Sequence, residues 1–303
     1  MPQSSSSRES ASIGIEDVAR LAQVSVSTVS NALNHPDRLA PATMDRVQRA
    51  IDALDYVPSS AARSLAAGTS RSVGLVLSDL GNSLFVDIAR GAEEEAERSG
   101  LSVLLANADS RLEREKRALA AFEASRVTGL LLTLNDSDHF SLIAARRAMR
   151  APTVLLNYHD ESGLYCSAYI DNVQGGRMAA DHLIETGRTR IVFVGGPPNL
   201  QPVVERRHGF HDALARAGLA PAGDFAPDGV NRADGWKIGR AIAPLVARGE
   251  IDGVMAATDL LASGIIQALA EEPGIDIPRT IAVILPARPA REALPAPAIA
   301  MRS

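Results

Sequence analysis

The sequence contains a single cysteine, Cys166, among its 303 residues. One cysteine excludes an internal disulfide and any metal site built from several cysteines, so nothing indicates an oxidising compartment. No stretch approaches the roughly 18 consecutive apolar residues that a membrane-spanning helix needs, and residues 1–12 are serine-rich without the apolar segment of a secretory signal. We therefore expect a cytoplasmic protein with no membrane partner, and we interpret residues 1–12 as a disordered arm.

Aromatic residues are also scarce, at 4% of the chain, although 46% of its residues are hydrophobic. A core built mainly from Leu, Ile, Val and Ala is typical of helices packed on both faces of parallel strands rather than of a β-sandwich. The formal net charge is −5, and six arginines within residues 12–71 are matched by six acidic residues, so a basic nucleic-acid-binding surface is missing from the composition. Composition predicts an α/β core, and any DNA-binding role has to be argued from motifs.

The motifs of several enzyme classes are missing as well. The sequence has no Walker loop, GxGxxG fingerprint, GxSxG nucleophile elbow or zinc-ligand spacing. His208 and His211 share one face of a predicted helix, but no third metal ligand accompanies them, and we interpret them as surface histidines. We therefore expect neither an enzyme nor a cofactor-binding protein.

Residues 13–58 carry the pattern of a small three-helix domain with a helix-turn-helix at residues 15–34. Ala19 is small where two helices must cross closely, Val24 fills the turn, and Ser25 is placed to cap the second helix. With Ser25 as the cap, Val26 and Asn31 project outward together with Ser27. A helix presented in this way can enter the major groove of DNA with its first residues at the base edges.

From residue 72 onward, apolar strand-like runs alternate with amphipathic helices, which predicts parallel strands joined by right-handed crossovers. The first series, residues 72–170, has expected strands at 73–77, 102–105, 129–133 and 154–156 and expected helices at 85–98, 113–125 and 140–150. The second, residues 171–285, has expected helices at 174–186, 203–217, 235–248 and 260–271 and expected strands at 191–194, 253–256 and 280–285. Two doubly wound lobes follow from this restart, and we name them the N-lobe and the C-lobe.

Residues 15–34, followed by Asn34-His35-Pro36-Asp37-Arg38 and by the run from Ala50 to Pro58, closely resemble the LacI/GalR family of transcriptional regulators. The resemblance implies an N-terminal three-helix helix-turn-helix plus a hinge helix, followed by an α/β two-lobed periplasmic-binding-protein-like (type I) sensor domain. It also implies a repressor that binds a pseudo-palindromic, double-stranded operator as a homodimer, or as a tetramer, and responds to a small-molecule effector that is sugar-like or nucleobase-like. Such a regulator would act in the cytoplasm, at the nucleoid.

The resemblance assigns roles to individual residues of the helix-turn-helix. Val26, Ser27 and Asn31 occupy its base-reading positions, and the phosphate-contacting positions are those of Ser25, Thr28, Ser30, Asn34 and Arg38. Many relatives carry arginine at the place of Asn31, so the operator preference is expected to be this chain's own, with adenine favoured by a bidentate amide. Three positions depart from the family pattern: Gly14 and Ala40 stand where hydroxyl caps are usual, and Gln23 where the turn usually has glycine.

Residues 59–71 match the hinge helix and linker of the same family. Ala61, Ala62 and Ala66 are small enough for two symmetry-related helices to pack face to face, and so short a helix is marginal without a partner. By resemblance, Ala62 and Leu65 belong to the DNA-binding residues, and Leu65 is the wedge that opens a base step from the minor groove. Without the family resemblance, Leu65 would be interpreted as an ordinary core leucine.

In the sensor domain, the resemblance and the placement of residues after strands indicate four effector-binding residues: Phe85, Asn157, Arg206 and Asp259. Arg206 would hold the effector and Asp259 would accept hydrogen bonds from it, while Phe85 would supply a stacking wall. Trp236 is a weaker candidate. These residues also have structural explanations that involve no ligand, because an aspartate after a strand is often only a helix cap and an arginine on a helix is often a surface residue.

Two further segments also match the family: Asp171-Asn172 with Gly175-Gly176, and Gly195-Gly196. We interpret them as turn and helix-start devices rather than as ligand-binding groups.

Two alternatives share part of this interpretation. A sugar-binding protein that serves a transporter would have the two lobes, but it needs a signal peptide and has no use for a helix-turn-helix. A regulator that binds DNA without a ligand, with the sensor lobes used only for dimerisation, would be separated from the main interpretation by calorimetry against a panel of metabolites.

The resemblance stops near Val283, and residues 286–303 are rich in Ala, Pro and Arg. Prolines of this spacing fit neither a central strand nor a helix interior. The chain also has two lysines, Lys116 and Lys237, against many arginines, which suits a GC-rich gene. We expect a truncated or frameshifted C-terminus, with a divergent tail that completes the lobes as the alternative.

The hinge match makes one prediction that DNA binding alone can test. Leu65→Ala should weaken operator binding at least tenfold, or about 1.4 kcal/mol, because the unstacked base step loses the side chain that fills it. Titration of a labelled operator measures the affinity, and sedimentation should show unchanged dimerisation. An unchanged operator affinity would remove the wedge role from Leu65.

Overall fold

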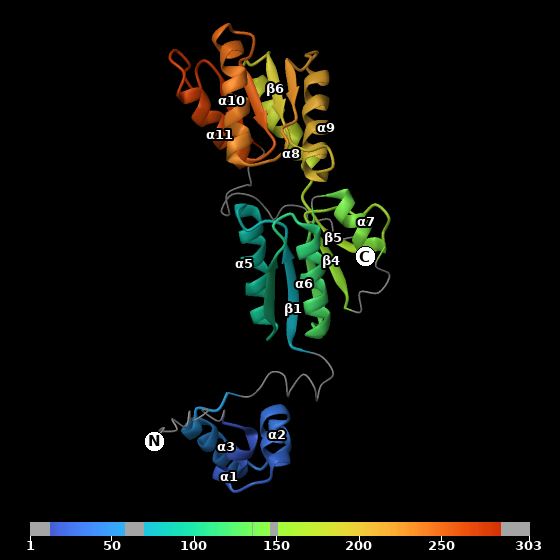
Figure 1. Cartoon of the computed structure of the whole chain (residues 1–303), viewed down its shortest axis with the longest axis vertical. Coiled ribbons are helices and arrows are strands. Elements are labelled where there is room, and N and C mark those ends of the chain that lie inside the picture. Colours follow the sequence, from blue (N-terminus) through green and yellow to red (C-terminus); the bar gives the residue numbers. More distant parts are fainter. Residues whose placement is uncertain (1–12, 58–69, 135, 146–150, 286–303) are drawn as a thin grey trace, which may run out of the picture. The chain divides into compact units, whose positions relative to one another are not determined.

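A computed structural model of the chain describes residues 13–57, 70–134, 136–145 and 151–285. The chain divides into two compact units, residues 1–70 and residues 71–303 (Figure 1). The predicted hinge helix, with Ala62 and Leu65, lies outside the described residues, as do the arm at residues 1–12 and the tail from residue 286. The hinge and the truncated C-terminus therefore stay predictions.

The described residues of the first unit form three α-helices and one 3-10 turn: α1 (Ile15–Ala22), α2 (Val26–Asn34), η1 (Pro36–Arg38) and α3 (Pro41–Leu54). Ser25 is the N-cap of α2, as the sequence predicts, and its hydroxyl accepts a hydrogen bond from the Thr28 N–H at 3.1 Å. The turn before α2 passes through Gln23, whose φ of 52° lies in the left-handed region. A side chain there costs about 1–2 kcal/mol relative to glycine, so this departure from the family pattern carries local strain.

One valine from each helix forms the centre of this small core. Val18, Val29 and Val47 are fully buried, and Ala19 and Val24 pack against them. The small side chain at Ala19 lets α1 and α2 approach closely, and Val24 closes the turn between them. The predicted three-helix core is confirmed.

The N-lobe is built on a five-stranded parallel sheet with strand order β2-β1-β3-β4-β5. Its strands are β1 (Ser72–Leu77), β2 (Ser102–Asn107), β3 (Gly129–Thr133), β4 (Thr153–Leu156) and β5 (Cys166–Ala168). Helix α5 (Ser83–Arg98) packs on one face of the sheet, whereas α6 (Leu112–Ala124) and α7 (Ser137–Ala145) pack on the other. This arrangement places the topological switch point, where ligands bind in such sheets, between β1 and β3.

The C-lobe repeats the plan with four parallel strands in the order β7-β6-β8-β9 (Figure 1). The strands are β6 (Ile191–Val194), β7 (Gly223–Phe225), β8 (Gly253–Ala256) and β9 (Ala282–Ile284). Helices α8 (Asn172–Glu185) and α9 (Gln201–Arg216) cover one face, and α10 (Arg232–Ala247) and α11 (Asp259–Ala270) cover the other. Every residue of β6 and β8 is buried, which agrees with their continuous apolar sequence.

Two strands escaped the sequence interpretation, β5 and β7. Each has three residues at the edge of its sheet, with the sequences Cys-Ser-Ala and Gly-Asp-Phe. Neither has the apolar or β-branched run that marks a strand, because only backbone pairing with β4 or β6 makes them extended. Among the described residues, the helices are too short or too polar to cross a membrane.

The start of α3 generates a stability prediction. Ala40 is the N-cap of α3, its side chain caps nothing, and Pro41 follows at the first helical position. Ala40→Ser should stabilise the first unit by about 1 kcal/mol, because a hydroxyl can accept a hydrogen bond from an unsatisfied N–H of the first turn. Urea unfolding of the full chain, followed by a signal from the first unit, measures the change in the free energy of unfolding.

Ala53→Ser provides the matched control, since Ala53 is exposed within the same helix and away from its cap. There serine should be neutral or slightly destabilising, because it has a lower helix propensity than alanine. Equal effects of the two substitutions would contradict the capping argument.

Candidate functional site

The outer face of α2 presents the residues that the sequence assigns to DNA. Val26, Ser27 and Asn31 are all exposed. The Ser25 hydroxyl lies 2.8 Å from the hydroxyls of both Ser27 and Thr28, so the start of the helix displays a linked set of hydroxyl groups. This geometry suits contacts to base edges and phosphates at a helix N-terminus.

The side chains after Asn31 are arranged differently. The Asn34 amide donates to the Ser30 carbonyl oxygen at 2.9 Å, so in the absence of DNA it is used within the helix. Arg38 is exposed in η1, and within the described part of the chain its guanidinium makes no hydrogen bond or ion pair. The face thus offers one unengaged cation close to the recognition helix.

In the C-lobe, Arg206 is fixed at two points. Its Nε donates to Asn172 Oδ1 at 3.0 Å, and its Nη1 donates to the Ala257 carbonyl oxygen at 2.5 Å. Burial lowers the pKa of the Arg206 guanidinium, and the negative charges of Glu205 and Asp259 act in the opposite direction. Arg206 is therefore not a free surface arginine but a positioned cation at the carboxyl end of β8.

Close contact between two helices makes this position possible. A Cβ atom on Gly176 of α8 would lie 2.2 Å from the Arg206 carbonyl oxygen, and one on Gly209 of α9 would lie 2.0 Å from the Val173 carbonyl oxygen. Side chains at either place would push the helices apart. Asp171 caps α8, in line with the helix start expected there, and Gly176 in the first turns of α8 also serves helix packing.

Asp259 begins α11 and is exposed. Thr258, not Asp259, is the helix cap, since the Thr258 hydroxyl accepts from the Leu261 N–H at 3.3 Å. The Asp259 carboxylate instead accepts a hydrogen bond from the Ser83 hydroxyl of the N-lobe at 3.4 Å. Asp259 thus faces the other lobe and contributes negative charge near Arg206.

Asn157 directly follows β4 and has a φ of 61°, a left-handed conformation that asparagine tolerates better than most residues. Its side chain is buried, and its Oδ1 has no hydrogen-bond partner among the described residues. A buried acceptor left unpaired costs about 1–3 kcal/mol. Such a group gains from any ligand donor that reaches it.

The two aromatic candidates are placed differently from each other. Phe85, on α5, is 3% exposed and packs against Leu75 and Leu77 of β1, so its ring forms part of the N-lobe core. Trp236 on α10 is 37% exposed, and the Arg240 guanidinium lies 5.9 Å from the centre of its ring. His211, one of the two surface histidines, lies 3.3 Å from Asp224 and forms a contact within the C-lobe.

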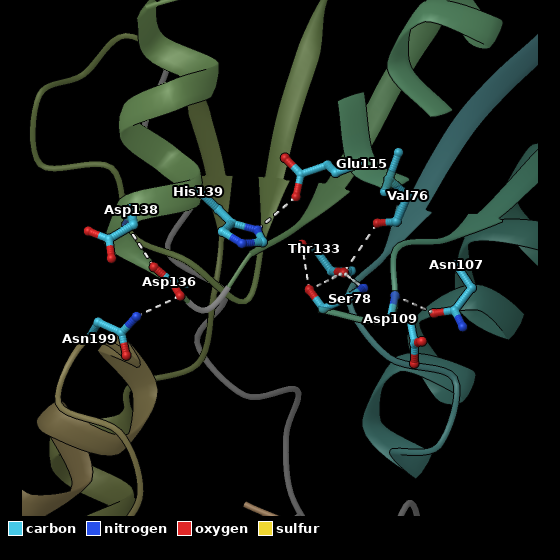
Figure 2. Close-up of polar contacts among 10 residues, drawn as sticks. All are labelled: Val76, Ser78, Asn107, Asp109, Glu115, Thr133, Asp136, Asp138, His139 and Asn199. Atoms are coloured by element: carbon cyan, nitrogen blue, oxygen red, sulfur yellow. Dashed lines mark hydrogen bonds and ion pairs between the residues drawn. The ribbon is translucent and has the colours of Figure 1, made fainter. Parts of the chain in front are cut away.

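A polar cavity lies at the switch point of the N-lobe sheet. Ser78 follows β1, and its hydroxyl donates to the Thr133 carbonyl oxygen at the end of β3 at 2.7 Å (Figure 2). The cavity has a volume of about 50 Å³ and is lined by Ser78, Ala108, Ser110, Glu115, Leu134, Asp136, His139 and Leu200. Leu200 belongs to the C-lobe, so the cavity lies where the lobes meet.

Two sets of hydrogen bonds join the lobes beside this cavity. The Asn199 amide donates to Asp136 at 2.7 Å, as Figure 2 shows. Gln201 pairs with the backbone of His159, accepting from its N–H at 2.7 Å and donating to its carbonyl oxygen at 3.0 Å. These contacts lie on one side of the lobe junction, and the Ser83–Asp259 contact is a separate one.

Residues 70–296 match the family described as "Periplasmic binding proteins and sugar binding domain of LacI family", and residues 14–59 match "Bacterial regulatory proteins, lacI family". The chain belongs to the LacI family of bacterial regulators. This LacI-family chain is 30% identical over 270 residues to the HTH-type transcriptional repressor PurR of Photobacterium profundum, covering 89% of the chain and 80% of that protein. It is 33% identical over 273 residues to the ribose operon repressor of Halalkalibacterium halodurans, covering 89% of the chain and 78% of that repressor.

Solved structures agree with this assignment. The lac repressor dimer bound to operator and the anti-inducer ONPF superposes with a TM-score of 0.77 at 26% identity, covering 89% of this chain and 81% of that one. A complex of the transcriptional regulator CelR with cellobiose gives 0.62 at 28% identity, with the same coverage. The fold class is therefore confirmed, and the LacI-family chain is a ligand-responsive DNA-binding transcriptional regulator rather than an enzyme.

The LacI-family resemblance did not reveal one buried pair, Glu115 and His139. His139 Nδ1 lies 2.9 Å from Glu115 Oε2, and Glu115 is only 4% exposed (Figure 2). The hydrogen bond to Glu115 raises the pKa of His139, and the charges of Glu115, Asp136 and Asp138 act in the same direction against burial. The two residues are 24 positions apart in the sequence and lie on different helices, so no local motif indicates the pair.

This pair makes the stability of the regulator depend on pH. The pKa of His139 is raised above its unfolded value of about 6.5, so its contribution to stability is complete below that pH and is lost as pH rises through the folded-state pKa. The wild type should therefore lose stability above about pH 6.5 relative to His139→Gln. Urea unfolding between pH 5.5 and 9 measures the difference.

His208→Gln is the control, because His208 is an exposed histidine elsewhere on the C-lobe. It should keep the pH dependence of the wild type. Parallel curves for the wild type and His139→Gln would contradict the role of the Glu115–His139 pair.

Proposed function

We propose that this regulator binds a pseudo-palindromic double-stranded operator as a homodimer in the bacterial cytoplasm, at the nucleoid, and represses transcription there. Val26, Ser27 and Asn31 read base edges in the major groove. The phosphates are held by Ser25, Thr28, Ser30, Asn34 and Arg38, and the hinge residues Ala62 and Leu65 enter the minor groove. The exposed face of α2 supports this assignment, as do the operator-bound lac repressor and the other repressors among its relatives.

The proposed effector is a sugar-like or nucleobase-like small molecule bound where the lobes meet. Arg206, Asp259 and Asn157 would contact it, and Phe85 would support the N-lobe wall beside Ser83. One observation carries this proposal: Arg206 is anchored to Asn172 and Ala257 at the carboxyl end of a C-lobe strand, beside a carboxylate that already contacts the N-lobe. Similar proteins include a ribose operon repressor and a regulator bound to cellobiose.

The lobe contacts suggest how effector binding reaches the DNA. The Ser83–Asp259 hydrogen bond is long, at 3.4 Å, so a ligand hydroxyl can replace it at little cost. A ligand that prefers one arrangement of the lobes shifts their equilibrium and, through the hinge, the spacing of the two recognition helices. Effector site and operator are then coupled through one two-state element.

Selection of the bound operator from random DNA, followed by operator titrations with candidate metabolites, tests the proposal. Arg206→Ala and Asp259→Ala should each abolish the response to the effector and leave operator affinity unchanged, because neither residue belongs to the DNA-binding unit. Arg216→Ala is the matched control, since Arg216 is exposed at the far end of the same helix. An undiminished response to the effector in both site variants would place the effector site elsewhere. If no metabolite changed operator affinity, the regulator would act without a ligand.

A further inference from the structure

Glu205, next to Arg206 on α9, is tied to the proposed effector site by a shared partner. Asn172 Nδ2 donates to Glu205 Oε2 at 3.0 Å, while Asn172 Oδ1 accepts from Arg206 Nε at 3.0 Å. One buried amide therefore holds a carboxylate and a guanidinium side by side. The geometry fixes a negative charge next to the cation that the effector is to contact.

Two carboxyl groups surround the Arg206 guanidinium. Glu205 and Asp259 both act on the Arg206 guanidinium. Burial raises the pKa of Tyr158 in the N-lobe, and nearby carboxylates, Asp160 before all others and Glu205 least, act in the same direction. An anion that approached Arg206 would be repelled by the carboxylates of Glu205 and Asp259.

Arg206 nevertheless keeps hydrogen-bonding capacity for a ligand. A guanidinium has five N–H donors, and within the described residues Asn172 and the Ala257 carbonyl take one each. The remaining donors suit hydroxyl, ether or carbonyl oxygens, which accept hydrogen bonds without adding charge. A phosphate ester would bring up to two negative charges into the same place, beside two carboxylates already present.

We propose that Glu205 sets the charge selectivity of the effector site, so that the sensor accepts an uncharged, hydroxyl-bearing effector and rejects phosphorylated ones. This inference rests on the proposed function, since it concerns the same site. Glu205 acts by balancing the charge of Arg206 together with Asp259, not by touching the effector. Its removal should convert Arg206 into an anion-binding group.

Glu205→Gln tests the role without disturbing the fold, because a glutamine oxygen can still accept the hydrogen bond from Asn172. Burial raises the pKa of Glu205, while the hydrogen bond from Asn172 acts in the opposite direction, so the titrations are made at pH 8 to favour the charged carboxylate. Calorimetry would titrate the full-length dimer with fructose 1-phosphate, with inorganic phosphate and with fructose. Sodium chloride keeps the ionic strength constant. The wild type should show no saturable binding of either anion up to 10 mM, whereas Glu205→Gln should bind fructose 1-phosphate at least tenfold more tightly than the wild type.

Two further variants locate the effect. Glu185→Gln removes the same charge from the opposite end of α8, about 20 Å away along the helix, and should behave as the wild type does. The double substitution Glu205→Gln with Arg206→Ala should lose the gain in anion binding. Affinity for fructose should not rise in Glu205→Gln, since fructose carries no charge.

Saturable binding of fructose 1-phosphate to the wild type would overturn the proposal, as would an absence of any gain in Glu205→Gln or an equal gain for fructose. Operator affinity, measured on the same samples, separates this outcome from failure of the proposed function. A chain that bound no operator would refute the regulator, while the anion titrations would still report on Glu205.

Discussion

The effector half of this protein depends on how closely α8 and α9 approach each other. Their backbones touch at Gly176 and Gly209, where a methyl group would lie about 2 Å from a carbonyl oxygen of the opposite helix. This contact brings Asn172, at the start of α8, within hydrogen-bond distance of Glu205 and Arg206 on α9. The same device joins α10 and α11, where a methyl group on Gly235 would lie 2.3 Å from the Leu261 carbonyl oxygen. Both helix pairs of the C-lobe are thus set by backbone contact rather than by interlocking side chains.

A guanidinium held in this way has a defined chemistry. Removing Arg206 from water costs several kcal/mol, and the cost is offset only if fixed partners replace the lost hydration. Asn172 and the Ala257 carbonyl supply hydrogen bonds, and Glu205 and Asp259 supply opposite charge. Because these partners come from α8, β8, α9 and α11, the position of the guanidinium reports on the packing of the whole C-lobe. The N–H donors of Arg206 that these partners do not use favour neutral oxygen ligands.

The sequence was a good guide wherever a local pattern decides the structure. The buried strands at 191–194 and 253–256 and the cap at Ser25 follow directly from apolar runs and from hydroxyl placement. Pairing between distant segments leaves no such local pattern in the sequence. Glu115 and His139 meet only because α6 and α7 cover the same face of the sheet, and β5 and β7 are strands only because a neighbour pairs with them. The packing role of Gly176 was not predicted for the same reason, since the backbone that it contacts, at Arg206, belongs to another helix.

The contacts between the lobes are uneven, and that asymmetry matters for signalling. On one side, Asp136 with Asn199 and His159 with Gln201 form short hydrogen bonds of 2.7 Å. The Ser83–Asp259 contact is longer, at 3.4 Å, and involves an exposed carboxylate that water can solvate equally well. A ligand hydroxyl would replace the long Ser83–Asp259 contact at less cost than the short contacts of Asp136 and His159. Glu115 and His139 line the same cavity as Asp136, and the charge of Asp136 acts on His139. Protonation of His139 therefore acts on the Asp136–Asn199 contact, whereas the proposed effector acts at Asp259.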